Sequence, residues 1–328
     1  MSTDLLQVEG LTKGFAVRSS KGRTARLQAL RGISFTLGRG ETLGIVGESG
    51  SGKSTLARSV LRLIEPDRGS IQFDGMDVRA LGGRGRADFN RRAQMVFQDP
   101  YSSLNPRMTV RAALAEAIGV HRLRPRAAVG ERVAELLDLV RLPQQAADRY
   151  PRDFSGGQRQ RIAIARALAV EPDCLIADEI VSALDVSIQA QIINLLLELQ
   201  DRLGLAMLFI SHDLRIVRHI SHRVAVMYLG EIVETGPAHA VFADPRHPYT
   251  QALLAAAPTL DPLRRGRQEA LRGELPSPID LPPGCSFSSR CPQVMARCRT
   301  VPPTLFPLDG ARQARCHLVE AASAPTEI

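Results

Sequence analysis

The chain has 328 residues, of which 44% are hydrophobic and 23% charged, a composition typical of an ordinary globular protein. Its net charge is +8, but the arginines are scattered, which favours solvated faces over a tract that binds nucleic acid. The N-terminal stretch MSTDLLQVEG has no basic and apolar regions of a secretory signal, and no apolar run approaches the roughly 20 residues that cross a bilayer. Any membrane role is therefore expected to depend on partner chains.

In chain order, residues 5–46 alternate apolar and turn-like stretches, which predicts a small antiparallel sheet followed by a core strand at residues 43–46. A Gly-rich turn and a helix come next. The apolar face of that helix is expected to hold Leu56, Val60, Leu63 and Ile64. Residues 71–73, followed by Asp74-Gly75, predict a strand and a hairpin turn.

Between about residues 100 and 170 the apolar pattern has the helical period, for example at Val133, Leu136, Leu137 and Val140. Strands are then predicted at residues 174–177 and 205–210, on either side of a helix. Its apolar stripe is expected to comprise Ile188, Ile192, Leu195, Leu196, Leu199 and Leu203. Strands that alternate with helices predict a mainly parallel sheet with functional groups at the strand ends.

The Gly-rich turn fits the phosphate-binding pattern G-x-x-x-x-G-K-[ST] and lies between a strand and a helix, as that pattern requires. It comprises Gly47, Glu48, Ser49, Gly50, Ser51, Gly52, Lys53 and Ser54, and Thr55 completes the predicted nucleotide-binding set. Backbone N–H groups of such a loop and the following helix N-terminus attract phosphates. Lys53 is expected to reach the β- and γ-phosphates of ATP, and the Ser54 hydroxyl to bind Mg²⁺.

The strand at residues 174–177 is followed by two adjacent acids, Asp178 and Glu179. Alone, such a pair is commonly just a polar strand end. Downstream of a phosphate loop, Asp178 is expected to hold Mg²⁺ through its hydration shell, and Glu179 to act as the general base for the attacking water.

Phe154-Ser155-Gly156-Gly157-Gln158 resembles the signature loop of the ABC ATPase family, and the resemblance covers residues 5 to about 235. It implies a P-loop NTPase (RecA-like) α/β core with an antiparallel β subdomain and a helical subdomain at about 100–170. In the family, the residues equivalent to Ser155, Gly156, Gly157 and Gln158 close over the γ-phosphate held by the opposite subunit. The resemblance therefore implies a dimer of ATPase subunits.

Four further positions match the family. Gln98 corresponds to the loop that senses Mg²⁺ and water, Asp185 to the loop that crosses the dimer interface, and His212 to the switch histidine at the γ-phosphate. Phe15 is expected to stack on the adenine. Ile180 departs from the family, which usually has Pro after the catalytic Glu, and this leaves the hydrolysis rate open.

Two segments are more specific, the motif at residues 98–108 and His247-Pro-Tyr-Thr-Gln-Ala-Leu-Leu254. Both resemble the oligopeptide/dipeptide/nickel permease subfamily. That implies an importer with two transmembrane permease subunits, a second ATPase subunit, identical or homologous, and an extracytoplasmic solute-binding protein. This chain is then expected to lie peripherally on the cytoplasmic face of the inner membrane. Peptides are the commonest cargo of the subfamily, with nickel chelates and some sugars as minorities.

Residues 1–235 are predicted to form the nucleotide-binding domain, and residues 236–328 a separate, Pro-rich and loop-rich appendage. The appendage holds Cys285, Cys291, Cys298 and Cys316. Disulfides are not expected in a reducing compartment, and four nearby thiolates are typical of a metal or iron–sulfur site. Similar cysteines in the subfamily are associated with a [4Fe–4S] cluster. Zinc and inert thiols stay open.

Two other functions were compared with the importer. A soluble ABC ATPase acting on nucleic acid or ribosomes is compatible with the +8 charge, but the chain holds one ATPase domain and no long heptad insertion. No nucleic-acid partner is therefore expected. An exporter half would need membrane helices from another chain, and the permease-type motifs disfavour it.

Overall fold

The structure, a computed structural model, describes residues 4–18, 24–99, 103–256 and 276–323. The chain divides into two compact units. The first unit comprises Met1–Leu6, Leu37–Thr42 and Phe73–Ile210, and the second comprises Gln7–Thr36, Leu43–Gln72 and Ser211–Ile328. Each unit is assembled from segments that are distant in sequence.

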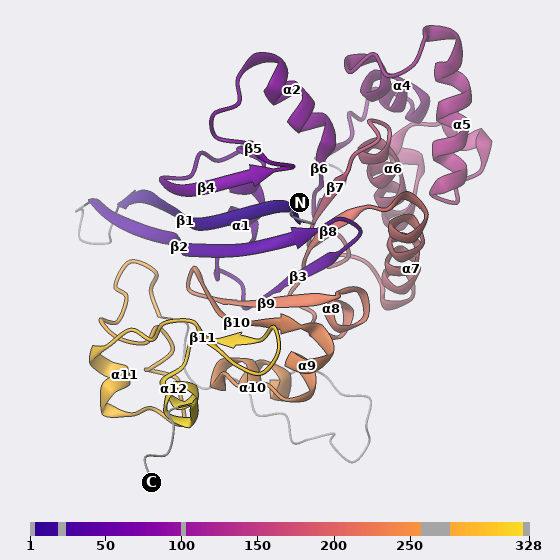
Figure 1. Ribbon diagram of the computed structural model, residues 1–328. Coiled ribbons are helices and arrows are strands. Elements are labelled where there is room, and N and C mark those ends of the chain that lie inside the picture. The colour runs from indigo at the N-terminus through magenta and orange to yellow at the C-terminus, as the bar shows by residue number, and fades with distance from the viewer. Residues whose placement is uncertain (1–3, 19–23, 100–102, 257–275, 324–328) are drawn as a thin grey trace. The chain divides into compact units, whose positions relative to one another are not determined.

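The first unit contains a parallel sheet and a group of helices (Figure 1). The parallel sheet contains β6 (Ala93–Val96), β7 (Cys174–Asp178) and β8 (Ala206–Ile210), and the two-residue strand β5 (Met76–Asp77) of this unit belongs to another sheet. The α-helices of this unit are α2 (Gly83–Arg92), α4 (Val110–Val120), α5 (Val129–Leu139), α6 (Gly156–Leu168) and α7 (Val186–Leu203), and its short 3₁₀ helices are Arg126–Ala128, Gln144–Asp148 and Pro151–Asp153.

Strand β7 pairs with β6 on one side and with β8 on the other, both in parallel. The register aligns Val96 with Ala177 and Asp178 with Ile210. Every residue of β7 and β8 is buried, as expected for parallel strands covered on both faces. The carboxyl ends of these strands therefore lie at one edge of the sheet.

Helices α4, α5 and α6 pack against one another, as predicted for residues 100–170 (Figure 1). The predicted stripe is confirmed, because Val133, Leu136, Leu137 and Val140 are all buried. Helix α4 begins at Thr109, whose hydroxyl accepts a hydrogen bond from the N–H of Ala112 at 3.2 Å.

Most of β1 (Asp4–Arg18), β2 (Thr24–Gly38) and β4 (Arg68–Phe73) belongs to the second unit, and these strands form a sheet with β5 in the order β2-β1-β4-β5. The other strands of the second unit are β3 (Thr42–Val46), β9 (Arg223–Tyr228), β10 (Glu231–Pro237), β11 (Phe306–Pro307) and β12 (Gln313–Ala314). Its helices are α1 (Lys53–Val60), α8 (Leu214–Ile220), α9 (Ala238–Ala243), α10 (Pro248–Ala256), α11 (Ala296–Thr300) and α12 (His317–Ser323).

Strand β3 pairs with β9 in parallel, whereas β9, β10, β12 and β11 continue the sheet in antiparallel pairs. The predicted parallel pairing is found for β3–β9, β6–β7 and β7–β8, and β10, β12 and β11 are antiparallel strands beyond those predicted. Because β12 pairs with β10, the C-terminal region shares a sheet with the residues before it. The prediction of a separate appendage is not confirmed.

Two predicted apolar helix faces extend too far. Helix α1 ends at Val60, and Arg62 adopts a left-handed conformation with φ 52°. The N–H of Leu63 then bonds back to the carbonyl of Arg58, the closing bond of a Schellman turn, and the Leu63 side chain is 57% exposed. Leu203, the last residue of α7, is 45% exposed because Gly204 ends the helix there.

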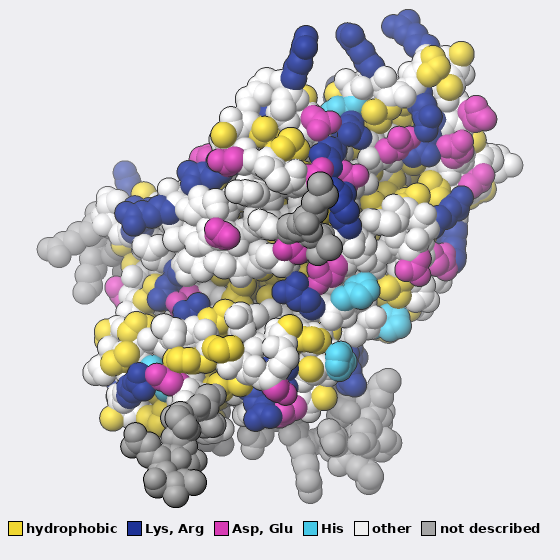
Figure 2. Space-filling view, viewed as in Figure 1, with side chains coloured by type: hydrophobic (Ala, Val, Ile, Leu, Met, Phe, Trp, Pro, Cys, Tyr) yellow, Lys and Arg dark blue, Asp and Glu magenta, His cyan; other side chains and the backbone are white. Residues whose placement is uncertain are grey.

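Helices long and apolar enough to span a membrane are lacking in the part of the chain that the structure describes. On the face drawn in Figure 2, Lys and Arg side chains are interspersed with Asp and Glu. That distribution agrees with scattered arginines on solvated faces.

Candidate functional site

The predicted phosphate loop connects β3 to α1 in the second unit, and two of its glycines are required by close backbone contacts. A Cβ atom on Gly47 would lie 2.2 Å from the carbonyl oxygen of Met227. A Cβ atom on Gly52 would lie 2.4 Å from that of Ala29, and Gly52 has a φ of 106°. Neither position accommodates a side chain, so the sequence pattern here reflects the packing of this loop.

The loop is closed by hydrogen bonds to its own carbonyls. The N–H of Ser51 donates to the carbonyl of Glu48 at 3.1 Å. The Lys53 ammonium, only 4% exposed as a residue, donates to the carbonyls of Gly47 at 2.8 Å and Glu48 at 3.0 Å. Lys53 is therefore a buried cation held over the loop, with Ser54 following it in the first turn of α1.

His212 lies near the base of the same loop. The N–H of Ser211 donates to the carbonyl of Ile45 in β3 at 3.2 Å, so the segment that carries His212 is attached to the strand that leads into the loop. Asp213 accepts hydrogen bonds at the start of α8 and fixes the chain direction after His212. Phe15 lies in β1, half-buried, with the Lys13 ammonium 5.4 Å from its ring centroid.

In the first unit, Asp178 is the last residue of β7 and Glu179 comes directly after it. Asp178 is 4% exposed. The N–H of Glu179 donates to the carbonyl of Ile210 at 2.9 Å, and Glu179 adopts a left-handed conformation with φ 50°. Six other non-glycine residues described in this chain also have positive φ, so the backbone alone does not mark Glu179 as functional. Ile180 behind it is buried.

Gln98 is connected to Glu179 through one serine. The Gln98 side-chain amide donates to the Ser182 hydroxyl at 3.2 Å, and that hydroxyl donates to the carbonyl of Glu179 at 2.9 Å. The structure therefore brings Gln98, Asp178 and Glu179 to one edge of the β6–β7–β8 sheet. Asp185 lies further along, as the residue before α7. Residues 100–102 of the specific motif at 98–108 lie outside the described residues.

The predicted signature loop forms the start of α6. Ser155 and Gln158 form a capping box, in which the Gln158 N–H donates to the Ser155 hydroxyl and the Ser155 N–H donates to the Gln158 side chain at 3.1 Å. Gly156 and Gly157 occupy the first turn. The helix start consequently presents backbone N–H groups and a hydroxyl, a combination suited to binding an anion.

Gly157 packs against α7, which gives a prediction about stability. A Cβ atom at Gly157 would lie 2.4 Å from Cγ2 of Ile188, whereas one at Gly156 would lie 3.4 Å from Leu184. We expect Gly157→Ala to lower the free energy of unfolding by about 1–3 kcal/mol through overpacking, while Gly156→Ala, the matched control, changes it little. Denaturant unfolding of both variants measures this. Equal stability of the two would contradict the close contact.

Two residues from the C-terminal region contact the phosphate loop, and sequence reasoning assigned them no role. The Tyr249 hydroxyl accepts a hydrogen bond from the N–H of Glu48 at 2.9 Å. Arg290 binds the Glu48 carboxylate through two hydrogen bonds of 2.7 and 3.1 Å. Tyr249 lies in the His-Pro-Tyr-Thr-Gln segment that resembles the permease subfamily, and that resemblance could have indicated a functional role for Tyr249. Arg290 offered none beyond its place next to Cys291.

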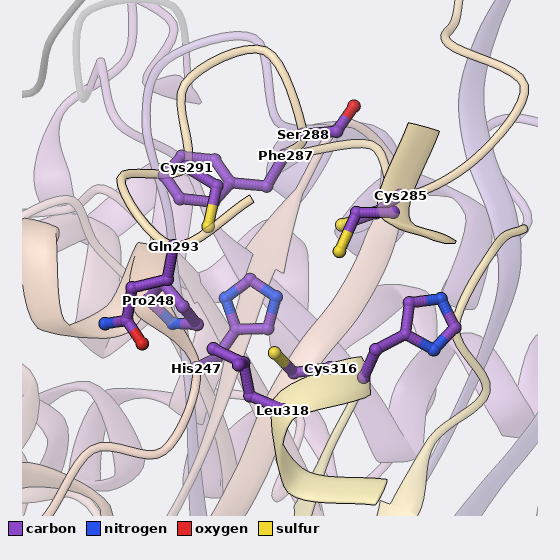
Figure 3. A pocket seen from close by; sticks show the side chains of 11 residues that line it. His247, Pro248, Cys285, Phe287, Ser288, Cys291, Gln293, Cys316 and Leu318 are labelled. Atoms are coloured by element: carbon purple, nitrogen blue, oxygen red, sulfur yellow. The ribbon is translucent and has the colours of Figure 1, made fainter. Parts of the chain in front are cut away.

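All four C-terminal cysteines line one pocket together with His247 and His317 (Figure 3). Burial raises the pKa of Cys285 to about 11 and also raises the pKa of Cys291 and Cys316, so these thiols hold their protons at neutral pH. Among the described residues, however, no group of three or more His, Cys, Asp and Glu side chains is arranged to hold a metal ion. The cysteines thus converge on a pocket without forming a ready ligand set.

Two family models match the chain, that of ABC transporters at residues 30–182 and that of the oligopeptide/dipeptide transporter C-terminal region at residues 233–298. A probable peptide ABC transporter ATP-binding protein of Sinorhizobium fredii is 50% identical over 99% of this chain and 92% of its own length. The chain belongs to the ABC transporter ATP-binding proteins. A putative oligopeptide transport ATP-binding protein of Bacillus subtilis is 46% identical, over 99% of this chain and 98% of its own.

Among solved structures, a dimeric ATP-binding cassette in a post-hydrolysis state with ADP and Pi matches with a TM-score of 0.63 at 28% identity. The match covers 71% of this chain and 98% of that one. The ABC ATPase fold and the family resemblance predicted from the motifs are thereby confirmed. As an ABC ATP-binding subunit, the chain binds and hydrolyses ATP, for which Mg²⁺ is the expected companion ion.

Proposed function

We propose that this ABC ATPase drives the import of oligopeptides or dipeptides. In this proposal it works at the cytoplasmic face of the plasma membrane with two permease subunits, a second ATPase subunit and an extracytoplasmic solute-binding protein. The observation that carries the proposal is the near full-length identity of 50% to a probable peptide transporter subunit. The match of residues 233–298 to the oligopeptide/dipeptide transporter C-terminal region supports it.

The second unit supplies the groups proposed to bind the triphosphate. Lys53 would exchange its bonds to the Gly47 and Glu48 carbonyls for bonds to the β- and γ-phosphate oxygens, which carry more negative charge. The backbone N–H groups of residues 47–52 and the N-terminus of α1 would hold the remaining oxygens. His212 would contact the γ-phosphate and Phe15 the adenine.

The first unit supplies the groups proposed to act on water. Glu179 would accept the proton of the water that attacks the γ-phosphate in line, and its backbone N–H and carbonyl are both held by hydrogen bonds. Asp178 and Gln98 are the proposed Mg²⁺ ligands of this unit, and Ser54 is the proposed Mg²⁺ ligand of the second unit; the ion would neutralise charge on the phosphate oxygens. Ser155, Gly156, Gly157, Gln158 and Asp185 would act on the nucleotide of the opposite ATPase subunit.

The cargo is tested by uptake of labelled di- and oligopeptides into the native host. We expect uptake to be lost when the gene is deleted, restored by the wild-type gene, and not restored by Glu179→Gln. Normal peptide uptake in the deletion strain, together with loss of nickel or sugar uptake, would overturn the peptide assignment and leave the importer standing.

Although the described side chains are not arranged as a ready ligand set, we also propose that the cysteine pocket holds a [4Fe–4S] cluster, because all four thiols line this one pocket. We expect protein purified without oxygen to contain iron and inorganic sulfide with a visible charge-transfer absorption, and Cys298→Ser to lose them. Cys174→Ala is the matched control, since Cys174 lies in β7 and outside the pocket. Stoichiometric zinc without the absorption, or protein free of both metals, would overturn the cluster.

A further inference from the structure

Glu48 places a carboxylate inside a loop that has to bind an anion. The N–H, the carbonyl and the carboxylate of Glu48 all form hydrogen bonds. The N–H donates to the Tyr249 hydroxyl at 2.9 Å, and the carbonyl accepts from Ser51 at 3.1 Å and Lys53 at 3.0 Å. The carboxylate binds Arg290 through both oxygens, at 2.7 and 3.1 Å. Glu48 therefore has one position, set partly by two residues from the C-terminal region.

Arg290 is suited to neutralise this carboxylate. Its side chain is 4% exposed, whereas that of Glu48 is 26% exposed, so the pair is largely shielded from solvent. The hydrogen bonds that Arg290 donates to Glu48 raise the pKa of Arg290, which stays charged at any physiological pH. A two-fold hydrogen-bonded arginine–carboxylate pair combines charge neutralisation with a fixed geometry, and lysine does not reproduce that geometry.

The position of Arg290 depends on the segment that carries the cysteines. Its N–H donates to the carbonyl of Phe287 at 3.0 Å, in a turn that also connects Ser288 to Cys285. Phe287 is 1% exposed and packs on the rings of Tyr228 and Tyr249, at 5.3 and 5.4 Å between centroids. Figure 3 shows Phe287 beside Cys285 and Cys291 at the same pocket. The turn that carries Cys285 therefore packs on the aromatic rings, and both contact the phosphate loop, the turn through Arg290 and the rings through Tyr249.

An unpaired carboxylate near a triphosphate would repel it, because like charges at short distance in a partly desolvated site interact strongly. We propose that Arg290 and Tyr249 are positioning residues of the nucleotide site, which neutralise and orient Glu48 so that the phosphate loop accepts phosphates. The inference rests on the proposed role of this loop in binding ATP. It makes the C-terminal region a determinant of nucleotide affinity in addition to any role toward the transporter.

The test is a cycle of variants in which ADP affinity is measured by titration calorimetry. We expect Arg290→Gln to weaken ADP binding on the order of tenfold, since it leaves the Glu48 charge uncompensated. Adding Glu48→Gln should restore most of that affinity. Tyr249→Phe keeps the ring packing and removes only the hydrogen-bond acceptor, and it should weaken binding severalfold. The control Arg297→Gln removes an exposed ion pair to Glu320 in the same region and should bind as wild type.

Steady-state hydrolysis separates positioning from loss of fold. Arg290→Gln should raise KM for ATP with kcat nearly unchanged, and the double variant should return KM toward wild type. Wild-type affinity in Arg290→Gln, or a double variant that binds no better than Arg290→Gln alone, would overturn the inference. Lys53→Ala measured in parallel distinguishes the two claims. If Lys53→Ala also binds ADP with wild-type affinity, the proposed function of the loop is wrong. If Lys53→Ala loses ADP binding while Arg290→Gln binds normally, only the proposed role of Arg290 is wrong.

Discussion

Replacing Glu179 with Gln is expected to reduce ATP hydrolysis by a factor on the order of 10²–10⁴ while ATP binding persists, the usual effect of removing a general base. Glutamine has nearly the same shape and keeps the backbone bonds from Glu179 to Ile210 and Ser182. It cannot take the proton of the attacking water. Phosphate release measures the loss of hydrolysis, and gel filtration with ATP should reveal a trapped dimer.

Glu198→Gln is the matched control for that variant. Glu198 is an exposed carboxylate of α7 paired with Arg141, so its loss should leave hydrolysis unchanged. A Glu179→Gln protein that hydrolyses ATP as fast as wild type would show that another group activates the water.

Lys53→Ala is expected to weaken ATP affinity on the order of a hundredfold or more, because it removes charge-assisted hydrogen bonds from a cation that is otherwise buried. The substitution also removes the hydrogen bonds that Lys53 donates to the carbonyls of Gly47 and Glu48. Equilibrium binding of labelled ATP measures the change. Arg58→Ala, an exposed residue of the same helix, is the control and should bind normally. Unchanged affinity in Lys53→Ala would contradict the phosphate-loop assignment.

The sequence was most informative where a local pattern determines local structure. The loop at residues 47–54 could be located because Gly47 and Gly52 are needed for backbone contacts that exclude a Cβ atom. The strands predicted at residues 174–177 and 205–210 correspond to β7 and β8, and they were found because both are short, apolar and followed by polar residues. The start of α6 was visible as Ser155 and Gln158, three residues apart, the spacing of a capping box.

Long-range pairing was not accessible in the same way. Strands β11 and β12 have two residues each, too few to produce a periodic pattern, so the sheet they share with β10 went unpredicted. The ion pair between Glu48 and Arg290 joins residues 242 apart in sequence. The helix ends were missed for a related reason, since the left-handed conformation of Arg62 depends on local hydrogen bonding that an apolar period does not report.

The roles given to individual nucleotide-site residues, the division of the chain at residue 236 and the cluster stay predictions. Family membership is shown by the near full-length sequence identity to relatives. The roles of the nucleotide-site residues are proposed from their contacts within each unit. The contacts of Glu48 with Tyr249 and Arg290 join the phosphate loop to the C-terminal region.

The most direct test of the account is purification of this chain, with a tag, from native membranes and identification of the bound proteins by mass spectrometry. We expect two permease chains, a second ATPase subunit unless the pair is identical, and a peptide-binding protein. Recovery of ribosomal proteins or nucleic acid without a membrane partner would contradict it and would indicate a soluble ABC ATPase instead.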